Sequence, residues 1–259
     1  MSRIAALVYG GIAYLGFLAV TLYAIGFVGN FHVRIADGIY FVPQAVDLGR
    51  PAVPTLEALL IDGALLLLFA VQHSGMARQS AKSRLTRFIS PAIERTTYVM
   101  ATNVVLALLF WQWRAIGGTL WAFGDGTSAA VVLRVLNLGG WVLAFVATFL
   151  INHLELFGLQ QVYAHARGAE LSGPTFRQPY LYRWIRHPLY LGFLIAFWAT
   201  PVMTWGHVLF SVAATGYILV GVQLEERDLI RVFGDRYREY RQRVPMLLPR
   251  PGSRQKETV

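Results

Sequence analysis

Cysteine is absent from the 259 residues of this chain. Its absence excludes a disulfide framework, a cysteine nucleophile and a metal site with cysteine ligands. Charged residues are also scarce, at 14% of the sequence, whereas hydrophobic residues make up 56%. A water-soluble globule needs more polar surface than this composition provides. We therefore expect the protein to lie largely in lipid.

Long apolar stretches recur along the chain, at residues 5–29, 56–73, 97–113, 131–151 and 188–222. A helix needs about 20 apolar residues to cross a bilayer, so each stretch predicts a transmembrane segment. The first stretch is longer than the core of a signal peptide and lacks a small-residue cleavage site, so we expect it to be retained. The last stretch is too long for one upright helix and contains Pro201 and Gly206 near its middle, which predicts a helical hairpin.

The four single spans are expected at about residues 4–28, 55–74, 91–113 and 131–152, with Thr55 as the N-cap of the second. Trp111 and Trp113 suit a membrane interface at the end of the third span. Pro188 fits the first turn of the hairpin's first helix, where a missing N–H costs nothing.

Beyond the hairpin, apolar residues recur every three or four positions, with arginines between them. They are Leu229, Phe233, Tyr237, Tyr240 and Val244. This spacing predicts an amphipathic helix at the membrane surface. The predicted fold is thus an all-α integral membrane protein with five transmembrane helical segments, the last a helical hairpin, and a C-terminal amphipathic helix.

The net charge of +9 raises the possibility of a nucleic-acid partner, but the distribution of the basic residues indicates membrane topology instead. Of the 23 lysines and arginines, all but four lie at the N-terminus, in alternate connections or after the hairpin. The four exceptions are Arg34, Arg50, Arg114 and Arg134. Cytoplasmic connections carry the excess of basic residues. We therefore expect a cytoplasmic-membrane protein with both termini in the cytoplasm, and no nucleic-acid partner.

This topology brings several polar side chains to one depth at the cytoplasmic face. They are His73 at the end of the second span, Asn152 and His153 at the end of the fourth, and His187, Glu225 and Glu226 at the two ends of the hairpin. Ionisable groups near the hydrocarbon are costly, so their convergence predicts a site that faces the bundle interior. A metal site built from the three histidines has suitable ligands, but no short ligand spacing supports it, and we expect none.

His73 has two interpretations: a site residue, or an interfacial histidine solvated by water. Asp62 lies three turns before it on the same helix face, together with Leu66 and Phe69. A carboxylate this deep in the span favours the site, although it could equally bond a neighbouring helix.

The segment from Tyr182 to Gly192 contains the pattern RHPxYxG, beginning at Arg186, and a glutamate pair follows at Glu225 and Glu226. These two motifs resemble those of the isoprenylcysteine carboxyl methyltransferases and bacterial phospholipid methyltransferases. The resemblance covers about 65 residues and includes the later tyrosines and Val244-Pro245.

The resemblance implies that S-adenosylmethionine binds on the cytoplasmic side, between the two ends of the hairpin. Carried over residue by residue, the cofactor contacts would be Tyr182, Arg186, His187, Tyr190, Gly192, Glu225 and Glu226. The helix N-terminus at Pro188 would favour the cofactor carboxylate. Glutamates could hold the ribose hydroxyls or the amino group, and Gly192 would let the adenosine approach the backbone.

The rest of the chain is similar to the bacterial methanethiol S-methyltransferases. The segments that carry this similarity are 70–74 (AVQHS), 91–95 (PAIER), 110–113 (FWQW) and 151–159 (INHLELFGL). The similarity implies S-methylation of the volatile thiol methanethiol, and more weakly of hydrogen sulfide, to give dimethyl sulfide. No internal repeat or low-complexity segment is evident, so we expect a single domain over residues 1–259, with a four-helix membrane part at 1–152 and a cofactor-binding part at 153–259.

Such a reaction requires a thiolate, because the thiol is a weaker nucleophile. A histidine can take the thiol proton. Our candidates for the base or substrate contact are His73 first and His153 second, with Asn152 beside it. The alternatives are methylation of a lipid amine or prenylcysteine carboxylate, a reductase of the sterol type, and a membrane scaffold or transporter without enzymatic activity.

Overall fold

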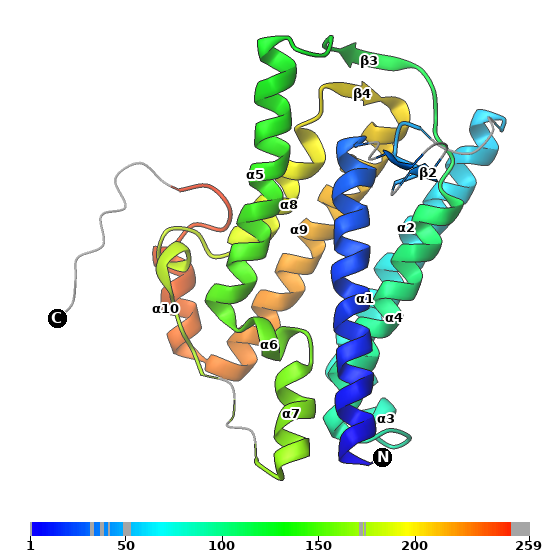
Figure 1. Cartoon of the computed structure of the whole chain (residues 1–259). Helices are drawn as coiled ribbons and strands as arrows, with labels where there is room; N and C mark the ends of the chain where they lie inside the picture. Colours follow the sequence, from blue (N-terminus) through cyan, green and yellow to red (C-terminus); the bar gives the residue numbers. More distant parts are fainter. Residues whose placement is uncertain are drawn as a thin grey trace.

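The computed structural model describes residues 2–31, 34–36, 39–40, 42–48, 53–170, 173 and 175–249, most of which are helical (Figure 1). In chain order the helices are α1 (Arg3–Gly29), α2 (Thr55–Ala77), α3 (Gln79–Leu85), α4 (Pro91–Gln112), α5 (Ser128–Ile151), α6 (His153–Leu156), α7 (Leu159–Arg167), the 3-10 turn η1 (Tyr180–Arg183), α8 (Pro188–Trp198), α9 (Trp205–Phe233) and α10 (Asp235–Arg243). The strands in these residues are β1 (Arg34–Ala36), β2 (Ile39–Tyr40), β3 (Thr119–Ala122) and β4 (Val202–Thr204). The connection between the first two predicted spans lies partly outside the described residues, and the residues after 249 lie wholly outside them.

Five of the described helices, α1, α2, α4, α5 and α9, are long and apolar enough to cross a membrane. They contain 22 to 29 residues, or about 33 to 43 Å of helix at 1.5 Å per residue. Large apolar side chains on them point outward: Ile4 is 75% exposed, Leu60 65% and Leu67 63%. Such surfaces suit lipid rather than water. The prediction of an all-α, multi-pass membrane protein is confirmed.

The two ends of the bundle differ (Figure 1). At the end that we call the basic end, α1, α4 and α8 begin and α2, α5 and α9 finish. The short helices α3, α6, α7 and α10 also lie there. At the opposite end, which we call the strand end, β3 pairs with β4 in antiparallel register, Thr119 with Thr204 and Ala122 with Val202.

Local sequence explains where the spans begin. Helix α4 starts at Pro91, and the Ser90 side chain caps it by accepting from the N–H of Ala92. The Thr127 hydroxyl caps α5 in the same way. The prediction for Thr55 is wrong, because Thr55 is already helical and the cap position holds Pro54, which makes no side-chain cap bond.

The predicted hairpin is formed by α8 and α9, but its two helices are unequal. Helix α8 has 11 residues, about 16 Å of helix, and ends close to the strand end, where the Phe197 carbonyl lies 2.9 Å from His207 Nε2. The chain then turns through Pro201 and β4 into α9, which has 29 residues. Helix α9 continues about two turns past Glu225 and Glu226, to Phe233. The expectation that the glutamate pair ends the hairpin is therefore wrong.

Helices α5 and α8 pack closely because small residues face each other. A Cβ added at Gly192 would lie 2.5 Å from the carbonyl oxygen of Gly140, and one at Gly140 would lie 2.5 Å from that of Gly192. Ala144 and Ala196, one turn further along each helix, complete two small-xxx-small pairs. Asn137 adds a hydrogen bond from Nδ2 to the Ala196 carbonyl, at 2.7 Å.

The C-terminal helix differs from the prediction. The helix is interrupted at Gly234, whose φ of 59° and ψ of −130° suit only glycine, so no single helix runs from 229 to 244. Tyr237, Tyr240 and Val244 are 2%, 4% and 5% exposed, packed on Phe176 and the end of α9. The apolar face of α10 is therefore covered by protein and does not face lipid.

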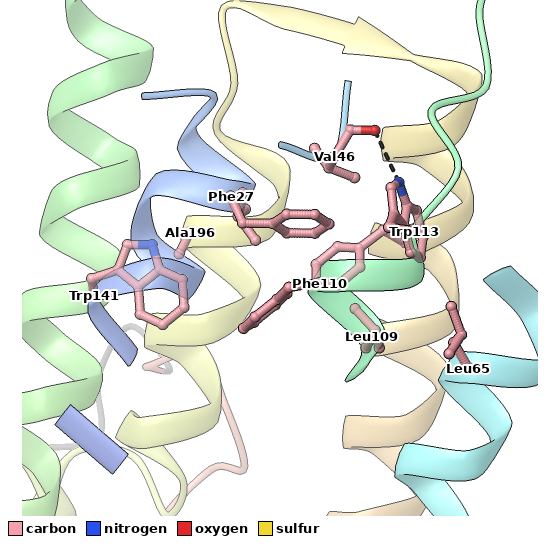
Figure 2. Packing of buried hydrophobic residues seen from close by; sticks show 10 residues of the cluster. Phe27, Val46, Leu65, Leu109, Phe110, Trp113, Trp141 and Ala196 are labelled. Atoms are coloured by element: carbon pink, nitrogen blue, oxygen red, sulfur yellow. Dashed lines mark hydrogen bonds between the residues drawn. The ribbon is translucent and has the colours of Figure 1, made fainter. Parts of the chain in front are cut away.

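The main core lies toward the strand end, where α1, α4 and α9 meet (Figure 2). Phe27 contacts Phe110 at 4.9 Å and Trp113 at 5.8 Å between ring centroids. Trp113 is 0% exposed and donates Nε1–H to the Val46 carbonyl at 3.0 Å. The interfacial role predicted for Trp113 is thus wrong, whereas Trp111 is 59% exposed as an interface requires.

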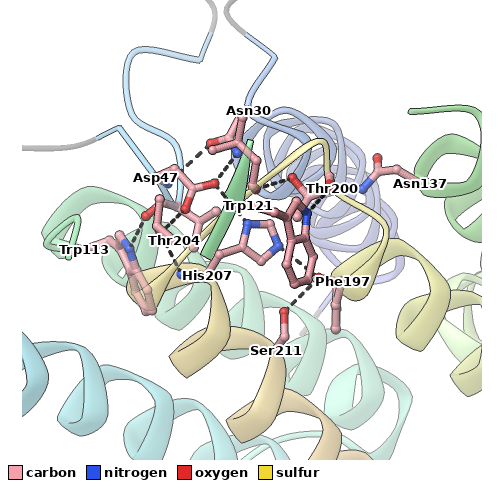
Figure 3. Close-up of polar contacts among 12 residues, drawn as sticks. Asn30, Asp47, Trp113, Trp121, Asn137, Phe197, Thr200, Thr204, His207 and Ser211 are labelled. Carbon is pink, nitrogen blue, oxygen red and sulfur yellow. Dashed lines mark hydrogen bonds and ion pairs between the residues drawn. The ribbon is translucent and has the colours of Figure 1, made fainter. Parts of the chain in front are cut away.

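A buried polar network lies at the strand end (Figure 3). The Asp47 carboxylate accepts hydrogen bonds from Asn30 and Thr204 and from His207 Nδ1 at 3.0 Å. His207 is 0% exposed, and its Nε2 lies 2.9 Å from the carbonyl oxygen of Phe197. The network joins the end of α1, the following loop, and both helices of the hairpin.

Candidate functional site

Glu226 is the centre of a polar network at the basic end, between the start of α8 and α9. It is 2% exposed. Its Oε1 accepts from Arg186 Nε at 2.7 Å and from His187 Nε2 at 3.1 Å. Arg241 Nε lies 3.5 Å from Oε2. Because a buried carboxylate is costly without partners, the RHPxYxG segment and the glutamate pair stabilise each other.

Arg186 joins this network to the segment that follows α10. Its Nη1 donates to the carbonyl of Arg241 at 2.8 Å and to that of Val244. Its backbone N–H donates to the Pro245 carbonyl at 2.9 Å. The donors of Arg186 are thus largely satisfied within the protein. The side chain forms the wall of the site and has little remaining capacity for a ligand.

Glu225 differs from Glu226 because its side chain is 44% exposed. One carboxylate oxygen accepts from the Tyr190 hydroxyl at 2.9 Å, and His187 Nδ1 lies 3.9 Å away. The remaining lone pairs of Glu225 can accept hydrogen bonds from a ligand. Among the predicted cofactor residues, Glu225 and Tyr190 are therefore the polar groups best able to contact one.

Tyr182 lies in η1 and connects the site to α5. Its hydroxyl is 3.4 Å from the Ala147 carbonyl, and its own carbonyl accepts from the Tyr240 hydroxyl at 2.6 Å. Burial raises the pKa of Tyr182 above its ordinary value, so the phenol is neutral. These two hydrogen bonds connect the turn that precedes the RHPxYxG segment to α5 and α10.

Gly192 does not face the cofactor residues. Its missing side chain makes room for Gly140 and Ala144 of α5, as described above. The expectation that Gly192 lets adenosine approach the backbone is corrected by this contact, because the glycine permits a close helix crossing instead.

His73, near the end of α2, lies in an aromatic cluster. Its ring stacks on Phe69, with centroids 5.2 Å apart, and contacts Tyr98 at 5.0 Å and Tyr217 at 6.3 Å. The Tyr98 hydroxyl lies 2.7 Å from Nε2 and 3.0 Å from Nδ1, and the Thr102 hydroxyl lies 3.3 Å from Nδ1. This histidine is thus held by protein groups and is not an interfacial residue solvated only by water.

His153 begins α6 and is 4% exposed. Phe149 stacks on it at 4.1 Å with a 7° interplanar angle, and Phe157 packs at 4.7 Å. Its Nδ1 lies 2.7 Å from the Thr148 hydroxyl and its Nε2 lies 2.8 Å from the Tyr14 hydroxyl. Burial lowers the pKa of His153, so the ring is neutral with both nitrogens partnered.

Asn152 is the residue between α5 and α6. Its Oδ1 accepts from the N–H of Glu155, and its Nδ2 donates to the side chains of Glu155 and Gln160, both at 2.8 Å. These bonds cap α6. They also use both N–H groups of the amide, so neither is left to bind a substrate. The structure therefore gives the Asn152 side chain a structural function.

Asp62 and His73 share a helix face but lie about 16 Å apart along α2. Asp62 is 0% exposed, and its Oδ1 accepts from the backbone N–H of Arg114 at 2.9 Å, near the strand end. Of the two interpretations of Asp62, the bond to a neighbouring element is the one that the structure supports.

The His73 cluster adjoins the cofactor residues through tyrosines that the sequence did not single out. Ser74 donates to the Tyr217 hydroxyl at 3.2 Å, and Tyr190 interacts electrostatically with Tyr98 and Tyr217. The chain has 12 tyrosines, so residue type alone does not distinguish Tyr98 or Tyr217 from the others. Tyr98 follows Arg95 by three residues, so its depth in α4 was a usable signal.

Within the part of the chain that the structure describes, no three histidine, cysteine or acidic side chains are arranged to hold a metal ion. His73, His153 and His187 instead bind tyrosine, threonine and glutamate partners.

The sequence matches known families over most of its length. The family described as "Protein of unknown function (DUF1295)" matches residues 94–244. Methanethiol S-methyltransferase 1 of Bradyrhizobium diazoefficiens is 51% identical over 94% of this chain and 82% of its own length. Methanethiol S-methyltransferase of Mycobacterium tuberculosis is 49% identical over 97% of this chain and 98% of its own.

A more distant relative is Nurim of Rattus norvegicus, 33% identical over 76% of this chain and 75% of its own length. No solved structure matches the chain. The matched regions cover 94% and 97% of this chain and therefore include both halves of the bundle. The chain belongs to the family of membrane proteins that contains the methanethiol S-methyltransferases.

Proposed function

We propose that this protein transfers a methyl group from S-adenosylmethionine to methanethiol, giving dimethyl sulfide, and more weakly methylates hydrogen sulfide. The observation that carries the proposal is the buried network of Arg186, His187 and Glu226, which adjoins the half-exposed Glu225 and its hydrogen-bond partner Tyr190. The relatives that share the whole chain are named methanethiol S-methyltransferases, which supports the same acceptor.

The residues present fit the methyl donor. S-adenosylmethionine, when bound, would supply a methyl group on its sulfonium. A thiolate would attack the methyl carbon in line, and the donor's sulfur would leave as a thioether. Glu225 has free acceptor capacity for the donor's ammonium or ribose hydroxyls. The first turn of α8, where Leu189 and Tyr190 have no intrahelical acceptor for their N–H groups, favours its carboxylate. Arg186 and Glu226 keep these groups in position.

The acceptor would lie beside His73. The rings of Phe69, Tyr98 and Tyr217 pack against this histidine, and such an aromatic environment favours a small, apolar thiol. His73 takes the thiol proton, because the thiolate is the stronger nucleophile and an ordinary thiol has a pKa above neutrality.

We also infer that the basic end faces the cytoplasm, because the connections there carry most of the lysines and arginines. The termini would then be cytoplasmic, in a bacterial inner membrane. Both proposed substrates are available from that side, since S-adenosylmethionine is a cytoplasmic metabolite and methanethiol crosses lipid readily.

The test is methyl transfer by the purified, detergent-solubilised protein, with S-adenosylmethionine and a panel of acceptors, measured as volatile products in the headspace. We expect dimethyl sulfide from methanethiol at the highest rate. Hydrogen sulfide should react more slowly, because a missing methyl group costs about 1 to 3 kcal/mol of discrimination. Longer thiols should react poorly for steric reasons.

Heat-treated protein is the control for uncatalysed methylation. Efficient transfer to a phospholipid amine or a prenylcysteine, with none to methanethiol, would contradict the proposed acceptor. Failure to bind S-adenosylmethionine in a calorimetric titration would contradict the proposed donor.

A further inference from the structure

Tyr98 is positioned to do more than support His73. It lies in α4 and is 8% exposed. Its hydroxyl is 2.7 Å from Nε2 of His73 and 3.0 Å from Nδ1. A phenol has one proton, so it can donate to only one of the two nitrogens at a time.

The Thr102 hydroxyl decides which nitrogen that is. Thr102 donates its single proton to the backbone carbonyl of Tyr98, at 3.0 Å. Its oxygen must therefore accept from His73 Nδ1, at 3.3 Å, which requires a proton on Nδ1. Nε2 is then the basic nitrogen, and the Tyr98 O–H donates to it. A thiol cannot reach the lone pair of Nε2 without displacing this hydroxyl.

Charged and titratable groups from several elements face this pair. The Arg95 guanidinium lies over the Tyr98 ring, 5.1 Å from its centroid, and is itself held by the Leu156 carbonyl at 2.8 Å. Glu94, Tyr217 and Tyr190 interact electrostatically with Tyr98. Tyr190 in turn donates to Glu225, which is proposed to contact the methyl donor.

We propose that Tyr98 is a further catalytic residue, which relays the acceptor's proton to His73. The thiol S–H bond breaks and its proton passes to the Tyr98 oxygen, while the Tyr98 proton passes to Nε2 of His73. The products of this step are a thiolate, an unchanged tyrosine and an imidazolium, so charge and protons balance. The inference rests on the proposed function and deepens it.

The first test is Tyr98→Phe, which keeps the ring and removes only the relay oxygen. We expect the rate with methanethiol to fall about 100-fold or more at neutral pH, within the usual contribution of general base catalysis. The rate should rise with pH as the thiol ionises unaided. With a selenol acceptor, which is already ionised at neutral pH, the variant should match the wild type.

Tyr9→Phe is the matched control. Tyr9 also bonds α4, through its hydroxyl to Thr97 at 3.3 Å, and its loss should leave the rate unchanged. Affinity for S-adenosylmethionine, measured by calorimetry, should be equal in the wild type and both variants. Equal loss with the thiol and the selenol would show a structural role and overturn the relay.

A second measurement does not depend on the folding of a variant. Nitrogen NMR of the wild-type protein labelled at histidine should show His73 as the tautomer with its proton on Nδ1. A proton on Nε2 would overturn the hydrogen-bond argument. So would loss of activity in Tyr14→Phe rather than Tyr98→Phe, because Tyr14 makes the equivalent bond to His153.

The two proposals fail in different ways. A wild-type protein that methylates no thiol contradicts the proposed function, and the relay with it. A wild-type protein that methylates methanethiol, with Tyr98→Phe equally active at neutral pH, contradicts the relay alone.

Discussion

At the scale of single residues, the two adjacent glutamates differ in burial and therefore in expected role. Glu226 is buried and paired with Arg186 and His187, whereas nearly half of the Glu225 side chain is exposed. In a helix, adjacent residues point about 100° apart, so one can face the protein while the other faces a ligand. Sequence motifs that contain both residues do not reveal this division.

We therefore expect Glu226→Gln and Glu225→Gln to differ. Glu226→Gln leaves the buried Arg186 without its charge partner and should destabilise the protein by about 3 to 5 kcal/mol. Glu225→Gln should leave thermal stability within about 0.5 kcal/mol and weaken the binding of S-adenosylmethionine. Thermal unfolding and calorimetric titration of both variants separate the two effects. Equal stability of the two variants would contradict this division.

At the scale of elements, the crossing of α5 and α8 positions the site. The RHPxYxG segment begins α8, and Tyr182 reaches α5 just before it. Because Gly140 and Gly192 bring the two backbones into contact, this crossing fixes the start of α8 relative to α5.

We predict that Gly140→Ala separates these helices. The new Cβ would lie 2.5 Å from a backbone oxygen and 2.6 Å from a backbone nitrogen of α8, neither of which can move alone. The cost should be about 1 to 3 kcal/mol, as for other overpacked sites, with weaker S-adenosylmethionine binding. Gly139→Ala, whose Cβ meets no atom within 4 Å, is the control and should be neutral or slightly stabilising. Thermal unfolding measures both, and equal stability would contradict the role of this crossing.

At the scale of the whole molecule, the two ends have separate polar networks. The basic end holds the candidate site, and the strand end holds the Asp47, Thr204 and His207 network, which joins parts of the chain about 160 residues apart. The second network has no contact with the cofactor residues in the interactions described above, so we interpret it as structural.

Asp47→Ala should accordingly destabilise the protein without changing its chemistry. The substitution leaves Asn30, Thr204 and His207 without their shared acceptor, at a cost of about 2 to 4 kcal/mol. Asp125→Ala is the control, because Asp125 is 89% exposed and pairs only with Arg134 in the described interactions; its effect should stay within about 0.5 kcal/mol. Methyl transfer measured well below the unfolding temperature should be normal in both variants. A specific loss of activity in Asp47→Ala would contradict the structural interpretation.

The membrane class, the five long helices and the hairpin are all readable from the sequence, because lipid requires long apolar runs and the ends of these runs carry charge. The sequence also determined the family, through motifs whose order along the chain is sufficient for recognition. Local signals set most helix starts, such as Ser90 with Pro91.

The contacts of each polar residue, by contrast, depend on how the helices pack. Gly192 packs on α5, Trp113 enters the core, and Asn152 caps α6. The bond between Tyr98 and His73 joins residues 25 positions apart on two helices. Depth in the membrane can be read from a sequence, since it follows from residue number along a helix. The rotation of each helix about its axis cannot, because it depends on which small and large side chains of its neighbours it meets.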